Sequence, residues 1–350
     1  MGLFKFNGIG IQSLSVTVPK SIVETINQTQ LFNEEQLRKF IETTGVKERR
    51  IADTEVCSSD LCYDAAIKLF EKTNIEREKI DALIFISQTP DYKVPGTSII
   101  LQDKLNLSKD TLAFDINLTC SGFVNGLFFS YSLLQNENIN NVLLLVGETL
   151  SKITSKEDKS TGLLLGDAGC ATLLAKDEKY GASYFSLNTD GSAYKSVIVP
   201  AGGFRNMSSK YTLESKTYSD GSIRNDEQLR MDGMDVFSFA VSEIPKDVKK
   251  ILNFAKMDIS IIDKVVFHQS NKYMMDVIAK KSKVDLSKMI YSIHKYGNTS
   301  GVSIPSAIAE QKKSITNHDI LLLNAIGAGF SWGTAILKLV DCEILDINEI

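Results

Sequence analysis

The sequence predicts an internally duplicated α/β protein, and two observations lead to this fold class. Short apolar runs typical of buried strands alternate with longer segments whose apolar residues recur at helical spacing. Three short matches between the two halves of the chain keep nearly constant offsets of 182, 178 and 179 residues. Alternating strands and helices favour sheets that lie between helices, so we expect mostly buried sheets.

The expected elements follow the same order in both halves. The first half is expected to form strands at 82–87, 112–116, 142–146 and 170–175, and helices at 31–43, 59–72 and 121–134. The second half is expected to form strands at 264–267, 320–324 and 334–340, and helices at 236–254, 272–281 and 301–311. All of these strands are interpreted as buried, because their residues are almost entirely apolar.

The internal repeat supports this division of the chain. IDALIF at 80–85 returns as IDKVVF at 262–267, NVLLL at 141–145 returns as DILLL at 319–323, and NLTCSG at 117–122 matches GNTSG at 297–301. Each match alone could arise by chance, but together they indicate duplication. We expect a first half at 1–185, an irregular connection at 186–230 and a second half at 231–350.

Composition narrows the function classes. The net charge is −4 and the pI about 5.6, so no general attraction to nucleic acid or to an anionic membrane is expected. The chain has no apolar run long enough to span a membrane and no signal-like start. Its five cysteines are widely spaced, which favours neither a disulfide framework nor a zinc site. We therefore expect a cytoplasmic protein without a metal.

Cys120 is the leading candidate for a nucleophile. It follows an apolar strand and directly precedes the expected helix that opens with Ser121 and Gly122. The unpaired N–H groups and positive dipole end of a helix favour the thiolate, which is the reactive form of cysteine. The alternative interpretation is a small buried hydrophobic residue, the commonest role of a lone cysteine.

Two further residues follow strand ends or repeat the Cys120 turn. His268 comes directly after the strand 264–267, at the edge where α/β proteins bind ligands, although it could equally cap the next helix. Asn298 matches the Cys120 turn in the repeat, but Asn-Thr-Ser is also ordinary capping sequence. The glycine-rich turn 327–333 lacks a following helix, so it indicates a tight strand connection or oxyanion donors rather than a phosphate loop.

Four motifs in this order resemble the signatures of the 3-oxoacyl-[acyl-carrier-protein] synthase III family. They are NLTCSGF, FHQSN, YGNTSGVSIP and GAGFSWG, and the stretches 45–52, 148–152 and 165–174 are also similar. The resemblance implies a thiolase-like five-layered αβαβα fold, a homodimer and a catalytic triad of Cys120, His268 and Asn298. It places the oxyanion against the N–H groups of Cys120 and Ala328.

The resemblance also implies a reaction. Cys120 would be acylated by an acyl-CoA or acyl-carrier-protein donor, and decarboxylative condensation with malonyl-[acyl-carrier-protein] would give a 3-oxoacyl product, with no cofactor. The alternative is a non-decarboxylative acyltransferase of the same fold that makes an ester or amide. Asn298 favours condensation, because an uncharged amide can donate a hydrogen bond to an enolate. A catalytically inactive binding protein is a third hypothesis.

Several positions depart from the family pattern. Lys39 and Lys159 stand where a tryptophan and an arginine hold the coenzyme A adenine in many relatives, which leaves the first acyl donor open. Val94 replaces a phenylalanine that closes the partner subunit's acyl pocket, which suggests a longer, branched or functionalised primer. Lys272, Lys280 and Lys281 form a basic cluster that could receive the acidic carrier protein, although such clusters are usually solvated helix faces.

Overall fold

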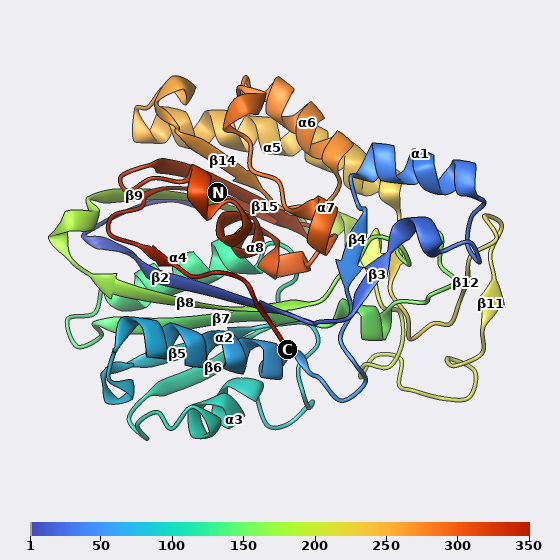
Figure 1. The fold of residues 1–350 in the computed structure, drawn as a ribbon, viewed down its shortest axis with the longest axis horizontal. Helices are drawn as coiled ribbons and strands as arrows, with labels where there is room; N and C mark the ends of the chain where they lie inside the picture. Colours follow the sequence, from blue (N-terminus) through green and yellow to red (C-terminus); the bar gives the residue numbers. More distant parts are fainter. Residues whose placement is uncertain (1) are drawn as a thin grey trace.

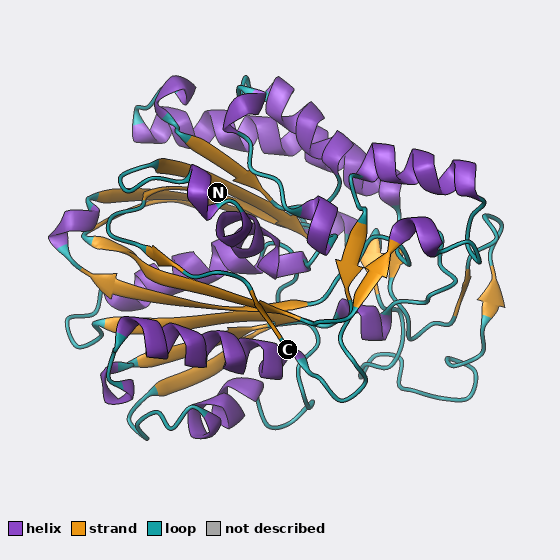
Figure 2. Cartoon of the chain, viewed as in Figure 1, coloured by secondary structure: helices purple, strands orange, loops and turns teal. Residues whose placement is uncertain are grey.

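The computed structural model describes residues 2–350 and arranges them in five layers of helices and sheets (Figure 1). The middle layer holds α4 (Gly122–Leu134) and α8 (Ser303–Glu310), and a sheet lies on each side of it. The outer layers are α5 (Gly233–Ala255) with α6 (Lys272–Lys281), and α2 (Ser58–Thr73) with α3 (Thr97–Lys104). Figure 2 shows the same alternation of helices and strands, and it confirms the predicted thiolase-like layering.

The two sheets repeat one strand arrangement. The first sheet runs β17 (Glu343–Ile344), β2 (Ile9–Val18), β8 (Ala168–Lys176), β7 (Asn141–Glu148), β5 (Ala82–Ile86) and β6 (Leu112–Ile116), with β18 (Asn348–Glu349) also beside β2. The second runs β1 (Gly2–Asn7), β9 (Ala182–Thr189), β16 (Ser331–Lys338), β15 (Ile320–Gly327) and β14 (Lys264–Phe267). In the first sheet β5 pairs parallel to β7, which pairs antiparallel to β8. In the second, β14, β15 and β16 pair in the same way, so the repeated sequences occupy equivalent strands.

Smaller elements gather on one side of the layers. They are α1 (Glu34–Thr44), α7 (Ile293–Tyr296) and the strand pairs β3 (Ile22–Glu24) with β4 (Glu48–Arg50), β10 (Val197–Ile198) with β13 (Arg230–Met231), and β11 (Lys216–Thr217) with β12 (Ile223–Arg224). Local sequence explains how α1 begins and ends. The Asn33 side chain accepts from the Gln36 N–H while the Gln36 side chain accepts from Asn33, and Gly45 ends the helix at a φ of 81°.

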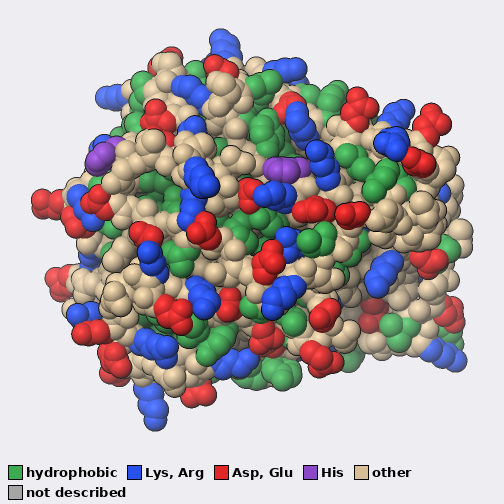
Figure 3. Space-filling model, in the orientation of Figure 1, with side chains coloured by type: hydrophobic (Ala, Val, Ile, Leu, Met, Phe, Trp, Pro, Cys, Tyr) green, Lys and Arg blue, Asp and Glu red, His purple; other side chains and the backbone are tan. Residues whose placement is uncertain are grey.

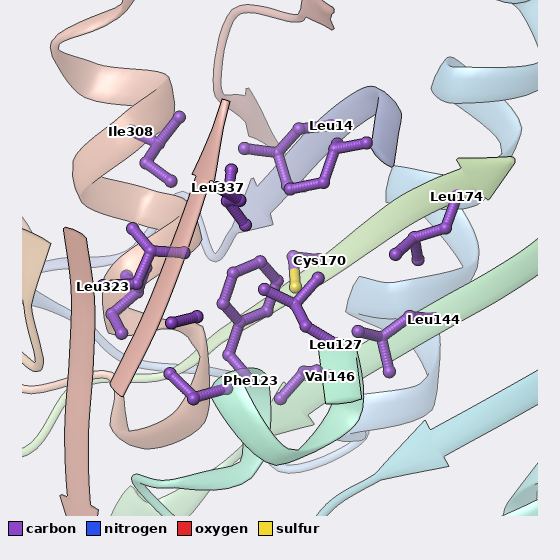
Figure 4. Packing of buried hydrophobic residues seen from close by; sticks show 14 of the residues in the cluster. Leu14, Phe123, Leu127, Leu144, Val146, Cys170, Leu174, Ile308, Leu323 and Leu337 are labelled. Carbon is purple, nitrogen blue, oxygen red and sulfur yellow. The ribbon is translucent and has the colours of Figure 1, made fainter. Parts of the chain in front are cut away.

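The largest core cluster lies in the middle layer, between the two sheets. Figure 4 shows Phe123 and Leu127 of α4 packed among residues of both sheets, including Val146, Cys170 and Leu323, all of them buried. Burying one such side chain contributes roughly 1.5–3 kcal/mol to stability. Both faces of each sheet are covered by helices, which explains why the strands read as continuous apolar runs.

Two expectations about the strands need correction. The strand 112–116 forms at the expected residues but is not buried, because β6 is the edge of its sheet and Leu112 is 47% exposed. The N-terminal strands β1 and β2 were not predicted, although β2 pairs with β8 along most of its length in the first sheet. Three of the buried β2 residues are serine or threonine, namely Ser13, Ser15 and Thr17, so its composition obscures its burial.

The surface carries no large field of one sign on the face seen in Figure 3, where basic and acidic side chains are interspersed. This agrees with the small net charge of −4. Among the described residues, no helix is both long enough and apolar enough to cross a membrane.

Candidate active site

One cavity of about 1070 Å³ is lined by residues from both halves of the chain. Cys120 enters it from the turn between β6 and α4, and His268 enters it from the residue after β14. Asn298 lies just before α8, and Ala328 belongs to the turn between β15 and β16. The three predicted triad residues therefore converge on one cavity, although they are up to 178 residues apart in the sequence.

The Cys120 turn is tight and closely enclosed. The Gly122 N–H donates to the Thr119 carbonyl at 2.7 Å, which closes the turn. A Cβ atom at Gly301 would lie 3.0 Å from the Thr119 carbonyl oxygen, and one at Gly327 would lie 2.9 Å from the Ser121 nitrogen. Glycine at these two positions therefore lets the turns of the second half approach the nucleophile.

Burial raises the pKa of Cys120 to about 11, against the expectation from sequence that its position favours the thiolate. Hydrogen bonds from Ser300 and Thr119 oppose this effect and lower the pKa. The Ser300 hydroxyl lies 3.6 Å from the sulfur. Cys120 also precedes the N-cap residue Ser121 rather than lying in the first turn of α4, which distances it from the helix N–H groups.

His268 is held between the second sheet and α8. Its backbone N–H donates to the Asn324 carbonyl at 2.8 Å, and its Nδ1 lies 2.7 Å from the Ser303 hydroxyl. That hydroxyl accepts from the Gln269 N–H, so its own proton is available for Nδ1. The neutral ring can then carry its proton on Nε2. Burial lowers the pKa of His268 to about 4, so the imidazole is neutral at pH 7.

The lowered pKa of His268 predicts an acid-dependent loss of stability. Well above pH 6.5 the imidazole is neutral in both folded and unfolded chains, and its contribution to the free energy of unfolding is independent of pH. As the pH falls from 6.5 toward 4, only the unfolded chain takes up the proton, so the free energy of unfolding should fall by about 1.4 kcal/mol per pH unit. Urea unfolding of the wild type and of His268→Gln between pH 7.5 and about 4.5 measures this difference.

Subtracting the two unfolding curves removes the contribution of the carboxyl groups that titrate in the same pH range, because both proteins contain them. The wild type should lose roughly 3 kcal/mol more than His268→Gln over the full interval. His318→Gln, which removes an exposed imidazole, is the matched control and should follow the wild type. Parallel curves for wild type and His268→Gln would contradict the assignment of a neutral buried ring.

Asn298 is oriented by its own turn. Its Oδ1 accepts the backbone N–H of Ser300 at 2.9 Å, and this fixes the amide so that the NH₂ group is left to donate. Ser300 adopts a φ of 52°, in the left-handed region that is uncommon for residues other than glycine. The Asn298 backbone is anchored on both sides, because its N–H donates to Leu164 and its carbonyl accepts from Gly166. The result is a buried, preorganised amide donor beside the nucleophile.

The Ala328 N–H, expected from sequence as an oxyanion donor, is engaged in the structure. It donates to the Thr119 hydroxyl at 3.1 Å. Ala328 lines the cavity and is half-buried. The oxyanion role of Ala328 therefore stays a prediction. An oxyanion that binds this N–H would have to compete with the Thr119 hydroxyl.

The positions expected to bind coenzyme A or the acyl chain lie outside the walls of this cavity. Lys39 is exposed, and the half-buried Lys159 donates to the Asp220 carbonyl and lies 5.9 Å from the centre of the Phe32 ring. Val94 is 83% exposed and does not line the cavity of its own chain. Such exposure is compatible with a contact to a partner subunit, so all three roles stay predictions.

The three lysines of the expected docking cluster have different surroundings. Lys272 lies beside the cavity residue Asn271 and pairs with Asp276 at 2.6 Å. Lys280 and Lys281 lie about 12–14 Å farther along α6. Lys281 donates to the Val241 carbonyl, whose usual helical partner is missing because residue 245 is proline. Only Lys272 adjoins the cavity, and the docking role of all three stays a prediction.

Sequence reasoning did not single out four residues that the structure places at the site. Thr119, Ser300 and Ser303 each contact a triad residue or the Ala328 N–H through a hydroxyl group. Cys57, at the start of α2, lines the same cavity as Cys120. Ser300 and Ser303 belong to the YGNTSGVSIP motif, but a serine just before an expected helix is usually interpreted as an N-cap residue, so the sequence did not indicate a role at the site. Among the described residues, no group of three or more His, Cys, Asp or Glu side chains could hold a metal ion.

Comparisons with known proteins place the chain in a family. Residues 114–191 match the model of 3-oxoacyl-[acyl-carrier-protein] synthase III, and residues 252–339 match the model of its C-terminal part. The beta-ketoacyl-[acyl-carrier-protein] synthase III of Fusobacterium nucleatum is 32% identical over 334 residues, covering 94% of this chain and 98% of its own.

Solved structures show the same relationship. The 3-oxoacyl-(acyl-carrier protein) synthase from Burkholderia xenovorans superposes with a TM-score of 0.92 at 34% identity, covering 100% of this chain and 99% of its own. The priming beta-ketosynthase of the R1128 polyketide pathway shares the fold, with a TM-score of 0.81 at 20% identity, covering 96% and 97% of the two chains. From its sequence, its fold and the residues that converge on its cavity, the chain belongs to the 3-oxoacyl-[acyl-carrier-protein] synthase III family.

Proposed function

We propose that this protein is a decarboxylative condensing enzyme that is acylated on Cys120 and then extends the acyl group with malonyl-[acyl-carrier-protein]. The product is a 3-oxoacyl-[acyl-carrier-protein]. The observation that carries the proposal is the convergence of a thiol, a neutral imidazole and a fixed amide donor on one cavity. A thiol alone would serve any acyl transfer, whereas two uncharged donors beside it suit an enolate.

The first step is the transfer of an acyl group to Cys120. The sulfur attacks the carbonyl carbon of an acyl thioester, and the carbonyl π electrons move to oxygen. Collapse of this intermediate breaks the bond to the donor's sulfur, which leaves as a thiol with the proton that Cys120 gives up. Backbone N–H groups near the developing oxyanion lower the barrier of this step. The donor is an acyl-CoA or an acyl-carrier protein.

The second step forms the carbon–carbon bond. Loss of carbon dioxide from the malonyl thioester leaves its bonding electrons as an enolate, whose oxygen accepts hydrogen bonds from His268 and Asn298. The enolate carbon attacks the acyl carbon, and Cys120 leaves as the thiolate and recovers a proton. A neutral His268 is suited to this role, because its ring N–H can donate a hydrogen bond to the enolate oxygen without a change in the protonation state of the ring.

Carbon dioxide release tests the proposal directly. The enzyme is incubated with a series of acyl-CoA and acyl-carrier-protein donors, followed by malonyl-carrier protein labelled in its free carboxyl group. We expect an acyl adduct of Cys120 from at least one donor, then labelled carbon dioxide and a 3-oxoacyl carrier in equal amounts. Acyl transfer to a hydroxyl or amine without carbon dioxide would contradict condensation and support the acyltransferase alternative. No adduct with any donor would support an inactive binding protein.

We also propose that the protein is a homodimer joined along β6. This strand is an unpaired edge of the first sheet, and an exposed edge is a template for pairing with another strand. Apolar side chains are exposed beside it, with Leu112 at 47%, Ile99 at 55% and Val94 at 83%. Pairing of two copies here would cover them and could bring Val94 toward the partner's cavity. Sedimentation equilibrium would contradict this if it gave the mass of one chain.

A further inference from the structure

Thr119 stands between the nucleophile and the β15–β16 turn. It is 8% exposed, lines the cavity and precedes Cys120 in the chain. Its hydroxyl accepts the Ala328 N–H at 3.1 Å. The same hydroxyl lies close to Gly327, where a Cβ atom would come within 2.7 Å of it, so the side chain has little freedom to turn away. The hydroxyl is therefore a fixed part of the cavity wall beside the sulfur.

The hydrogen bonding of this hydroxyl leaves its proton available. A threonine hydroxyl can accept two hydrogen bonds and donate one. With one acceptor position taken by the Ala328 N–H, the proton of Thr119 can point toward the Cys120 sulfur or toward a group bound against it. Thr119 directly precedes Cys120 and lines the same cavity, so its hydroxyl is within reach of a group bound against the sulfur, and a hydrogen bond from Thr119 also lowers the pKa of Cys120.

We propose that the Thr119 hydroxyl is an oxyanion donor of the acylation step, polarised from behind by the Ala328 N–H. When Cys120 attacks a thioester, the carbonyl oxygen gains charge close to the sulfur, within reach of the Thr119 proton. The proton is shared with the oxyanion and returns to Thr119 as the intermediate collapses, so no group is gained or lost. Donation by Ala328 makes the hydroxyl a stronger donor than an isolated one. This inference rests on the thioester chemistry proposed above.

Two variants and two reactions test the proposal. Thr119→Val keeps the shape and removes the hydroxyl, and Thr119→Ser keeps the hydroxyl. Acylation by the best thioester donor is followed by single-turnover mass spectrometry, and alkylation of Cys120 by iodoacetamide is followed in parallel. Alkylation needs the sulfur but forms no oxyanion, so it reports any effect on the nucleophile alone. Thermal unfolding of each variant identifies any loss of the fold.

We expect Thr119→Val to be acylated on the order of 10²-fold more slowly than the wild type, with a much smaller change in alkylation. Thr119→Ser should stay close to the wild type in both reactions. An equal fall of the acylation and alkylation rates in Thr119→Val would mean that the hydroxyl affects only the reactivity of the sulfur, and would overturn the proposal. Faster acylation of Thr119→Val would also overturn it, since the hydroxyl would then be blocking the Ala328 N–H. If the wild type accepts no thioester at all, the proposed function fails and this role falls with it.

Discussion

Replacing Cys120 with serine should abolish the acyl-enzyme. A serine hydroxyl is a far weaker nucleophile than a thiol unless a base activates it, and the neighbouring His268 is already engaged with the Ser303 hydroxyl. We expect acylation to fall by roughly 10³-fold or more, which places the adduct below detection in a single-turnover experiment. Intact-protein mass spectrometry after incubation with the donor measures this loss, and peptide mapping locates any adduct that remains.

Cys57→Ser is the matched control, because the chain offers a second cysteine that lines the same cavity. This variant should keep the full adduct on Cys120. An adduct that persists in Cys120→Ser and disappears in Cys57→Ser would mean that the nucleophile is the cysteine at the start of α2. The two variants therefore show which of the two cysteines in the cavity carries the acyl group.

Replacing Asn298 with alanine should separate the two half-reactions. The amide is held by the Ser300 N–H as a donor into the cavity, and the acylation step as proposed makes no use of it. Acyl-enzyme formation should stay close to the wild-type rate, while release of carbon dioxide from the malonyl thioester should fall by about 10²–10³-fold. Single-turnover acylation and release of labelled carbon dioxide measure the two steps independently.

The adjacent residue provides the control for this substitution. Thr299 is buried and its hydroxyl has no hydrogen-bond partner among the described residues, so Thr299→Val changes the same turn without removing a donor. It should condense at the wild-type rate. Equal loss of both half-reactions in Asn298→Ala would point to a collapsed turn, and unchanged carbon dioxide release would remove Asn298 from the enolate site.

The fold could be predicted largely because its strands are covered on both faces. Continuous apolar runs marked β5, β7, β14 and β15, and the residues that follow such runs were natural candidates for chemistry. His268 was found on this ground, whereas Cys120 was found because it lies between an expected strand and an expected helix. β2 was missed because it carries serine and threonine on buried positions, where hydroxyl groups replace the apolar signal.

The surroundings of the reactive groups could not be predicted in the same way. The contact between His268 and Ser303 joins residues 35 apart, and that between Thr119 and Ala328 joins residues 209 apart. Sequence pattern contains no information on such distances, which depend on how the two sheets pack. The pKa of Cys120 is a similar case, because the helix terminus could be read from the sequence while the larger effect of burial could not.

The duplicated architecture also distributes the reaction between its two copies. In the proposed reaction the first half supplies the sulfur that takes up the acyl group, and the second supplies the imidazole and the amide assigned to the incoming carbanion. Neither half alone encloses the cavity, since its walls come from residues as distant as Cys57 and Phe330. The proposed reaction therefore requires both halves to be folded against each other, with α4 and α8 between the two sheets. A single half would supply only part of the residues assigned to the proposed reaction.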